Sequence, residues 1–182
     1  MQCWHLSGAG NDFMVIDARG KELDFSAMAL TLCKLTGADG FMAVQESDKA
    51  DFRLHFYNSD GSRGEMCGNG SRCICRFAFE LGIAGENMTV ETDAGIVEGK
   101  RLSEETYLVR LNNPSVLDLQ RKGDIAYVEL GDPGVPHGVQ ELKKLSWAMA
   151  EMLREHAQAL RHDAAFPKGA NINLFTKLDD TT

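Results

Sequence analysis

The stretch that most constrains the fold of this chain is Met66-Cys67-Gly68-Asn69-Gly70-Ser71-Arg72-Cys73. It predicts a helix that starts near Gly68, directly after a cysteine, and ends at Gly82. Apolar residues recur along that helix at spacings of three or four, so one face is expected to pack in the core. These apolar residues are Ile74, Phe77, Ala78 and Leu81.

The position of Cys67 suggests chemistry as well as structure. A helix N-terminus stabilises a thiolate, because its unpaired amides and the helix dipole favour negative charge. Gly68 and Gly70 would let backbone N–H groups approach an anion such as a substrate carboxylate. Cys67 is therefore a candidate base or nucleophile beside a carboxylate-binding turn. The alternative is a small buried cysteine, as most free cysteines are, and spacing alone leaves both interpretations open.

Short strands and two further helices are expected on either side of this helix. A helix over 25–35 would be capped by Asp24 or Ser26 and stopped by Gly37, and another would run from Ser146 to about 162. Strands are expected over 2–6, 13–17, 41–46, 51–57, 88–91, 95–100, 107–111, 125–130, 137–142 and 170–175. Because neighbouring strands are mostly close in sequence, the predicted class is α+β with a mixed or antiparallel sheet.

A break at Asn112-Asn113-Pro114 predicts a boundary within 114–123. The expected domains are 1–115, which carries Cys67, and 116–182. A second, Gly/Pro-rich loop is expected over 131–136.

Composition excludes several classes of function. A formal net charge of −8 over 182 residues argues against a nucleic-acid or membrane-surface partner, since both require a basic face. No apolar run approaches the roughly 18 residues that would cross a bilayer, and the first residues do not resemble a signal peptide. An odd number of cysteines, five, indicates free thiols in a reducing compartment, so we expect a cytoplasmic protein.

The remaining candidate ligands favour structural roles. Cys67, Cys73 and Cys75 do not match a common zinc spacing, so no metal site is predicted. No GxGxxG or GxxxxGK[ST] motif is present to signal a nucleotide. Cys33, Cys73 and Cys75 are expected to be packing residues. No functional role is expected for His5, His55, His156 and His162, which fall on strands or a charged helix without a partner motif.

Seven stretches, in order along the whole chain, resemble the successive motifs of diaminopimelate epimerases. Each is weak alone, but seven in the right order are strong. They are 10–13 (GNDF), 37–40 (GADG), 57–62 (YNSDGS), 66–73 (MCGNGSRC), 91–95 (ETDAG), 136–139 (PHGV) and 169–173 (GANIN).

The resemblance implies a cofactor-independent isomerase of lysine and peptidoglycan precursor biosynthesis. In this family one cysteine thiolate removes the α-proton of LL- or meso-diaminopimelate, and a second cysteine thiol returns a proton from the opposite face. Neither pyridoxal phosphate nor metal is needed. The resemblance implies two similar lobes, each with strands wrapped around a central helix, the second lobe incomplete in this chain. A small amino acid is the implied partner, and a homodimer is left open.

The resemblance also implies roles for individual residues. Cys67 would be one of the two acid/base sulfurs, and His137 would lie near the reacting sulfurs and tune them. Gly68 and Asn69 would hold the α-carboxylate. Asn11, Gln45, Asn58 and Asn171 would contact the rest of the substrate.

Two departures from the family pattern leave alternatives open. The second catalytic cysteine of the family lies in an ACGTG-like motif, and the sequence to Thr182 does not contain it. We therefore expect the 182-residue polypeptide to be inactive by itself, as a fragment or as a chain that has lost one half-site. Val135 stands where the family usually has Asn, which keeps a related racemase with another substrate open. A cysteine hydrolase would need a histidine to activate Cys67, and only His137 could be offered.

Overall fold

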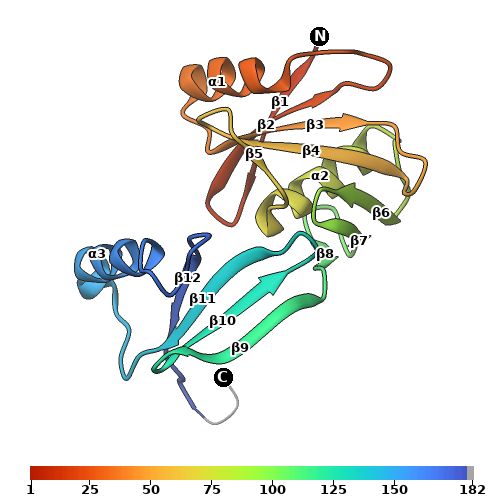
Figure 1. Cartoon of the computed structure of the whole chain (residues 1–182). Coiled ribbons are helices and arrows are strands. Elements are labelled where there is room, and N and C mark those ends of the chain that lie inside the picture. Colours follow the sequence, from red (N-terminus) through yellow and green to blue (C-terminus); the bar gives the residue numbers. More distant parts are fainter. Residues whose placement is uncertain (180–182) are drawn as a thin grey trace. The chain divides into compact units, whose positions relative to one another are not determined.

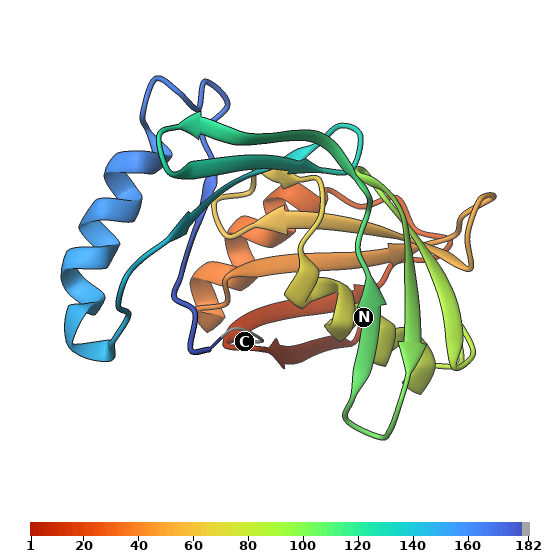
Figure 2. The same cartoon turned by 90° about the horizontal axis from the view of Figure 1, so that it is seen from below.

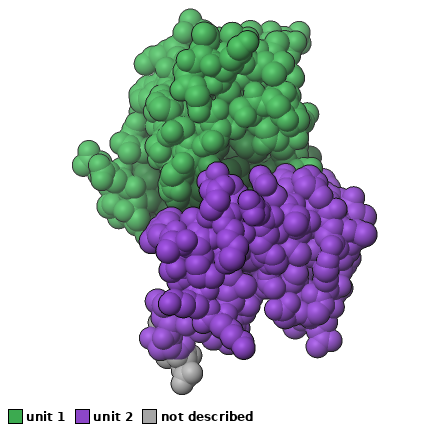
Figure 3. Space-filling view, turned by 90° about the vertical axis from the view of Figure 1, so that its left-hand side faces the viewer, with its two compact units in different colours: residues 1–112 green, residues 113–182 purple. Residues whose placement is uncertain are grey.

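The computed structural model describes residues 1–179 and divides the chain into two compact units, Met1–Asn112 and Asn113–Thr182 (Figures 1 and 3). Within residues 1–179 no helix has both the length and the apolar character to cross a membrane. Each unit has its own sheet and its own buried cluster.

Unit 1 is built on a mixed eight-stranded sheet with the strand order β1-β2-β3-β4-β6-β7-β8, and β5 pairs with β4. The β2–β3 and β4–β6 pairs are parallel and the others antiparallel. The strands are β1 (Cys3–Gly8), β2 (Asn11–Asp17), β3 (Gly40–Gln45), β4 (Phe52–Asn58), β5 (Arg63–Gly64), β6 (Asn87–Thr92), β7 (Gly95–Arg101) and β8 (Tyr107–Arg110). The predicted α+β class with a mixed sheet is confirmed.

Helix α2 (Gly68–Glu80) lies at the centre of this unit, and the strands curve around it (Figures 1 and 2). Three residues of its predicted apolar face are buried, Ile74, Phe77 and Ala78, at most 1% exposed, whereas Leu81 is exposed because α2 ends one residue before it. They pack with residues of β2, β3, β4, β6 and β7 in one cluster. The central helix that the family resemblance implies is therefore present. Several strands surround α2 because contact with them removes its apolar side chains from water.

Helix α1 (Phe25–Thr36) covers the other face of the sheet and forms as the sequence predicts. Asp24 caps it by accepting a hydrogen bond from the N–H of Ala27 at 3.0 Å. Gly37 ends it in the left-handed conformation, with φ 76°. Phe25 and Ala29 bury against Phe41 in a second cluster.

Unit 2 has a four-stranded sheet in the order β12-β11-β10-β9, with a parallel β11–β12 pair and antiparallel neighbours. Its strands are β9 (Pro114–Lys122), β10 (Ile125–Leu130), β11 (Val135–Glu141) and β12 (Asn171–Phe175). A short 3-10 helix, η1 (Trp147–Met149), leads into α3 (Ala150–Arg161). Tyr127 stacks on Phe166 at 5.8 Å between ring centroids, in a small cluster that includes Leu160 of α3.

The sequence did not predict the nine-residue strand β9, because its Leu117 and Leu119 are exposed and its apolar pattern is weak. Two other expectations for unit 2 are wrong. The loop expected over 131–136 ends earlier, since Val135 already begins β11. Ser146 makes no side-chain capping hydrogen bond, because the 3-10 turn separates it from α3.

Candidate active site

Cys67 is the N-cap residue of α2 and is itself the capping group. Its backbone is extended, with φ −134° and ψ 118°, and its sulfur accepts a hydrogen bond from the N–H of Gly70 at 3.4 Å. The backbone oxygen of Cys67 accepts from the N–H of Ser71 at 2.7 Å. The N–H groups of Gly68 and Asn69 precede the first intrahelical bond, so helix geometry leaves them available to an anion. Cys67 is half-buried.

The other cysteines lie in settings that keep them protonated. Burial raises the pKa of Cys73 to about 11 and that of Cys75 to about 12. Burial also raises the pKa of Cys33, and the charge of Asp39 adds to that effect. Cys3 is exposed on β1, although partial burial raises the pKa of its thiol as well. The three buried cysteines therefore have the packing role expected from the sequence.

Cys67 should consequently be the thiol alkylated fastest by iodoacetamide at pH 7 to 8. It combines access to solvent with a helix N-terminus, which stabilises the reactive thiolate. Peptide mapping by mass spectrometry after a brief treatment would measure all five rates in one sample. Faster labelling of Cys33 or Cys73 than of Cys67 would contradict the location of the site.

A chain of hydrogen bonds links the first turn of α2 to the start of β2 and to the turn before β3. The side-chain amide of Asn69 donates to the side-chain oxygen of Asn11 at 2.8 Å. Asn11 donates in turn to the carboxylate of Asp39 at 3.1 Å, which also accepts from the backbone N–H of Asp12 at 2.9 Å. At the other end, Arg72 donates to the side-chain oxygen of Asn69. Three of the seven motifs therefore meet at one place.

Asp39 and Arg72, at the two ends of this series of hydrogen bonds, fix the orientation of the side-chain amides between them. An ionised Asp39 only accepts hydrogen bonds and Arg72 only donates them, so each amide in between has one arrangement that satisfies both neighbours. Asp39 and Arg72 were not predicted as site residues, although both stand inside quoted motifs. The spacing of the motifs could not show that their side chains bond to Asn11 and Asn69.

Asn58 belongs to the same end of the sheet, whereas Gln45 does not. Asn58 pairs with Gly40 in the β3–β4 register, and the next residue, Ser59, donates its N–H to the backbone oxygen of Asp39 at 3.1 Å. Gln45 ends β3 five residues after Gly40, roughly 16–17 Å along the strand. Its side chain donates to the backbone oxygen of Lys21 at 3.1 Å. The structure links Asn11 to Asn69, two positions after Cys67, places Asn58 beside Gly40 with its amide donating to Ser62 at 2.9 Å, and leaves Gln45 apart.

In unit 2, His137 and Asn171 are cross-strand neighbours. They pair in the parallel β11–β12 register, and the amide of Asn173 lies 3.2 Å from Nδ1 of His137. Burial lowers the pKa of His137, which favours the neutral imidazole. Val135, at the start of β11, is buried at 8% exposure.

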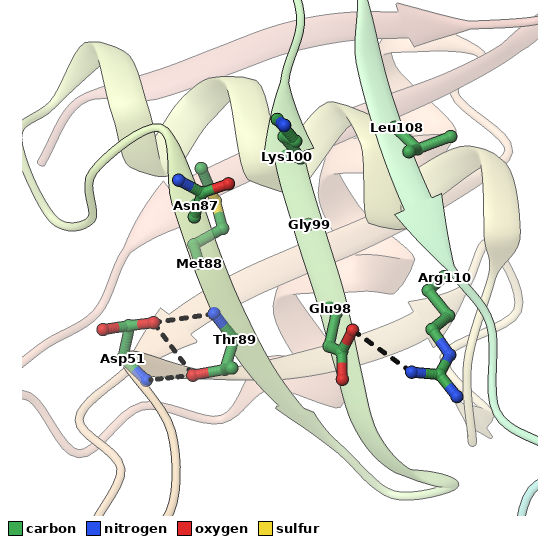
Figure 4. A pocket seen from close by; sticks show the side chains of 9 residues that line it. All are labelled: Asp51, Asn87, Met88, Thr89, Glu98, Gly99, Lys100, Leu108 and Arg110. Atoms are coloured by element: carbon green, nitrogen blue, oxygen red, sulfur yellow. Dashed lines mark hydrogen bonds and ion pairs between the residues drawn. The ribbon is translucent and has the colours of Figure 1, made fainter.

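A hollow of about 470 Å³ lies elsewhere on unit 1, over β6, β7 and β8 (Figure 4). Four of its polar residues contact one another in pairs: Asp51 accepts from Thr89 at 2.6 and 2.8 Å, and Glu98 lies 3.6 Å from Arg110. A Cβ built on Gly99 would meet the Cys75 sulfur of α2, so Glu98 and Lys100 on either side face away from the helix. This hollow does not include Cys67.

Among residues 1–179, no group of three or more His, Cys, Asp or Glu side chains is arranged to hold a metal ion.

The chain matches the model for diaminopimelate epimerase over residues 3–116. The diaminopimelate epimerase of Aquifex aeolicus is 33% identical over 201 residues, which cover 100% of this chain and 71% of that protein. The chain belongs to the diaminopimelate epimerase family. It is an isomerase of the epimerase type.

Solved structures show the same fold at low sequence identity. A phenazine biosynthesis protein of the PhzF family from Bacillus anthracis superposes with a TM-score of 0.66 at 17% identity, covering 99% of this chain and 69% of that one. A hydroxyproline epimerase from Agrobacterium vitis gives a TM-score of 0.60 at 16% identity, covering 88% and 58%. The fold of this chain is therefore shared with these proteins.

Proposed function

We propose that this chain of the diaminopimelate epimerase family contributes one half of a two-thiol site that interconverts LL- and meso-diaminopimelate. The observation that carries the proposal is Cys67 at the N-terminus of α2, with its sulfur capping the helix. Reaction at an amino-acid α-carbon needs a base beside a carboxylate-binding group, and this turn offers both.

In the proposed step, the Cys67 thiolate takes the α-proton, so the C–H bond breaks, an S–H bond forms and the electron pair stays on the substrate. The α-carboxylate would be held by the N–H groups of Gly68 and Asn69, which would stabilise the negative charge that develops beside it. Inversion then requires a proton from the opposite face, delivered by a second thiol. Holding base and substrate in this geometry must supply much of the rate, because an α-proton is a very weak acid.

The proposed substrate contacts in unit 1 are Asn11, Asn58 and Asn69; in support, Asn11 bonds to both Asp39 and Asn69, and Asn58 pairs with Gly40, the residue after Asp39. Gln45 stays outside this set because of its position on β3. From unit 2 the family motifs suggest Asn171 as a further substrate contact and His137, whose pKa is lowered by burial, as a further residue of the site in its neutral form.

The 182-residue polypeptide should exchange the α-hydrogen of one diaminopimelate stereoisomer with solvent deuterium, without epimerising it. One sulfur can remove and return a proton on one face only, and burial keeps Cys33, Cys73 and Cys75 protonated. Proton NMR in D₂O, with each stereoisomer separately, measures exchange and inversion together. Robust turnover in both directions by this polypeptide would overturn the two-thiol assignment, and absence of exchange with either isomer would count against Cys67 as the base.

A racemase or epimerase for a simpler amino acid is the second candidate, favoured by Val135. If the usual Asn bonds the distal end of diaminopimelate, valine leaves that polar group without its partner, at a cost of about 1–3 kcal/mol or roughly 5- to 150-fold in affinity. We favour diaminopimelate because Asn58 and Asn171 remain to supply such a bond. Relative exchange rates of diaminopimelate and of amino acids lacking the second amino-carboxylate end decide between the two. Faster exchange of the simpler amino acids would establish the second candidate.

A further inference from the structure

A network of charged side chains surrounds the motif at 91–95, to which the proposed function gives no role. Asp93 accepts hydrogen bonds from Nε and from a terminal nitrogen of Arg63, the second at 2.8 Å. It also accepts from Arg53 at 3.1 Å. Arg53 continues to Glu91 at 2.9 Å, and Glu91 accepts from the hydroxyl of Ser47 at 2.6 Å. The network therefore joins β5 to β4, to β6 and to the turn between β6 and β7.

The acidic members of this network are more shielded from water than its arginines. The side chains of Glu91 and Asp93 are 11% and 23% exposed, and those of Arg53 and Arg63 are 32% and 46% exposed. The hydrogen bonds and the neighbouring positive charges lower the pKa of Glu91, so it stays ionised. Shielded ion pairs that share partners in this way hold their geometry better than isolated surface pairs, which contribute little.

The network holds the segment that leads directly to Cys67. Strand β5 is only two residues long, and Arg63 in it stands four positions before Cys67. The next residue, Gly64, lies so close to the ring of Phe56 that an added Cβ would be 2.6 Å from it. Met66 then packs against the core cluster of α2. The backbone that leads to Cys67 is thus held at Arg63 by two interactions. One is the short strand pairing of β5, and the other is the bidentate ion pair of Arg63 with Asp93.

We propose that Asp93, acting through Arg63, is a positioning residue for Cys67. Asp93 anchors β5 so that the extended backbone of Cys67 brings its sulfur onto the N–H of Gly70. The hydrogen bond from the Gly70 N–H to the Cys67 sulfur is 3.4 Å long, so a small shift of residues 63–66 would break it. This inference deepens the proposed function, since it concerns the sulfur to which that function assigns proton transfer.

The test is the alkylation rate of Cys67 in an Asp93→Asn variant, with exposed Cys3 as the reference thiol in the same molecule. Asparagine keeps the shape of the side chain but removes the charge that holds Arg63 and Arg53. We expect the Cys67-to-Cys3 rate ratio to fall roughly tenfold, the effect of losing one charge-assisted hydrogen bond to the thiolate. Asp93→Glu, which keeps the charge, should recover most of the ratio. Glu86→Gln, which breaks the exposed Arg101–Glu86 pair, is the matched control and should leave it unchanged.

The pattern over all five cysteines separates positioning from a structural role. General loosening would expose Cys33, Cys73 and Cys75 to iodoacetamide, whereas loss of positioning changes Cys67 alone. An unchanged or increased ratio in Asp93→Asn, failure of Asp93→Glu to recover it, or simultaneous labelling of the buried cysteines would each overturn the inference. The measurement uses no diaminopimelate, so its failure is distinct from a failure of the proposed function, which would appear as absence of α-hydrogen exchange by the unmodified chain.

Discussion

Replacing Cys67 by serine is expected to reduce α-hydrogen exchange by about 10²- to 10⁴-fold, the range over which a positioned acid/base group contributes. A serine hydroxyl cannot serve as the base, because it does not ionise at neutral pH. The fold should survive, since serine is among the best N-cap residues and can accept the hydrogen bond from Gly70. The thermal unfolding midpoint should therefore match that of the unmodified chain or exceed it slightly.

Cys3→Ser is the matched control for this experiment. Cys3 is the exposed cysteine on β1, so its replacement removes a thiol without touching α2. Proton NMR in D₂O gives the exchange rate, and circular dichroism gives the unfolding midpoint. Exchange by Cys67→Ser within about threefold of the unmodified rate would exclude Cys67 as the base.

Replacing Phe77 by alanine should cost about 3–5 kcal/mol in the free energy of unfolding. Phe77 is 1% exposed in the centre of the unit 1 cluster, and Trp4 packs edge-on against it at 5.8 Å. Such a loss is comparable with the whole stability of a small domain, typically about 5–15 kcal/mol. Partial or complete unfolding of unit 1 is the expected result, measured by urea titration with circular dichroism.

Leu35→Ala on α1 serves as the comparison, because Leu35 is 77% exposed. Its replacement should change the free energy of unfolding by no more than about 0.5 kcal/mol. If both substitutions had similar effects, α2 would not be the element around which unit 1 is stabilised.

The sequence predicted unit 1 well because its elements have strong local determinants. The apolar face of α2, the Asp24 cap and the Gly37 stop of α1 each follow from residues within a few positions of one another. Unit 2 was predicted less well. Its strand β9 exposes Leu117 and Leu119 and lies at the edge of the sheet formed by residues 113–179, next to β10, so its apolar pattern does not distinguish it from a linker.

The candidate site was predictable in its residue types but not in its connections. Cys67 at a helix N-terminus follows from the sequence alone. The bonds from Asp39 to Asn11 and from Arg72 to Asn69 depend on how β2 and β3 approach α2, and no spacing rule gives that. The separation of Gln45 from Asn58 likewise depends on the strand register. The roles of Cys67, His137 and the Asn residues remain predictions.

The sulfur that caps α2 is also the atom proposed to exchange protons, so one atom connects catalysis to the stability of a helix. A thiolate is a stronger hydrogen-bond acceptor than a thiol, and it interacts more favourably with the helix dipole. Each proton that Cys67 receives should therefore weaken the first turn of α2, and each proton it gives up should strengthen that turn. Linkage makes the relation reciprocal: whatever tightens the first turn also favours the deprotonated sulfur. The hydrogen-exchange protection of the Gly70 N–H, which donates to that sulfur, should therefore be greater with the thiolate than with the thiol.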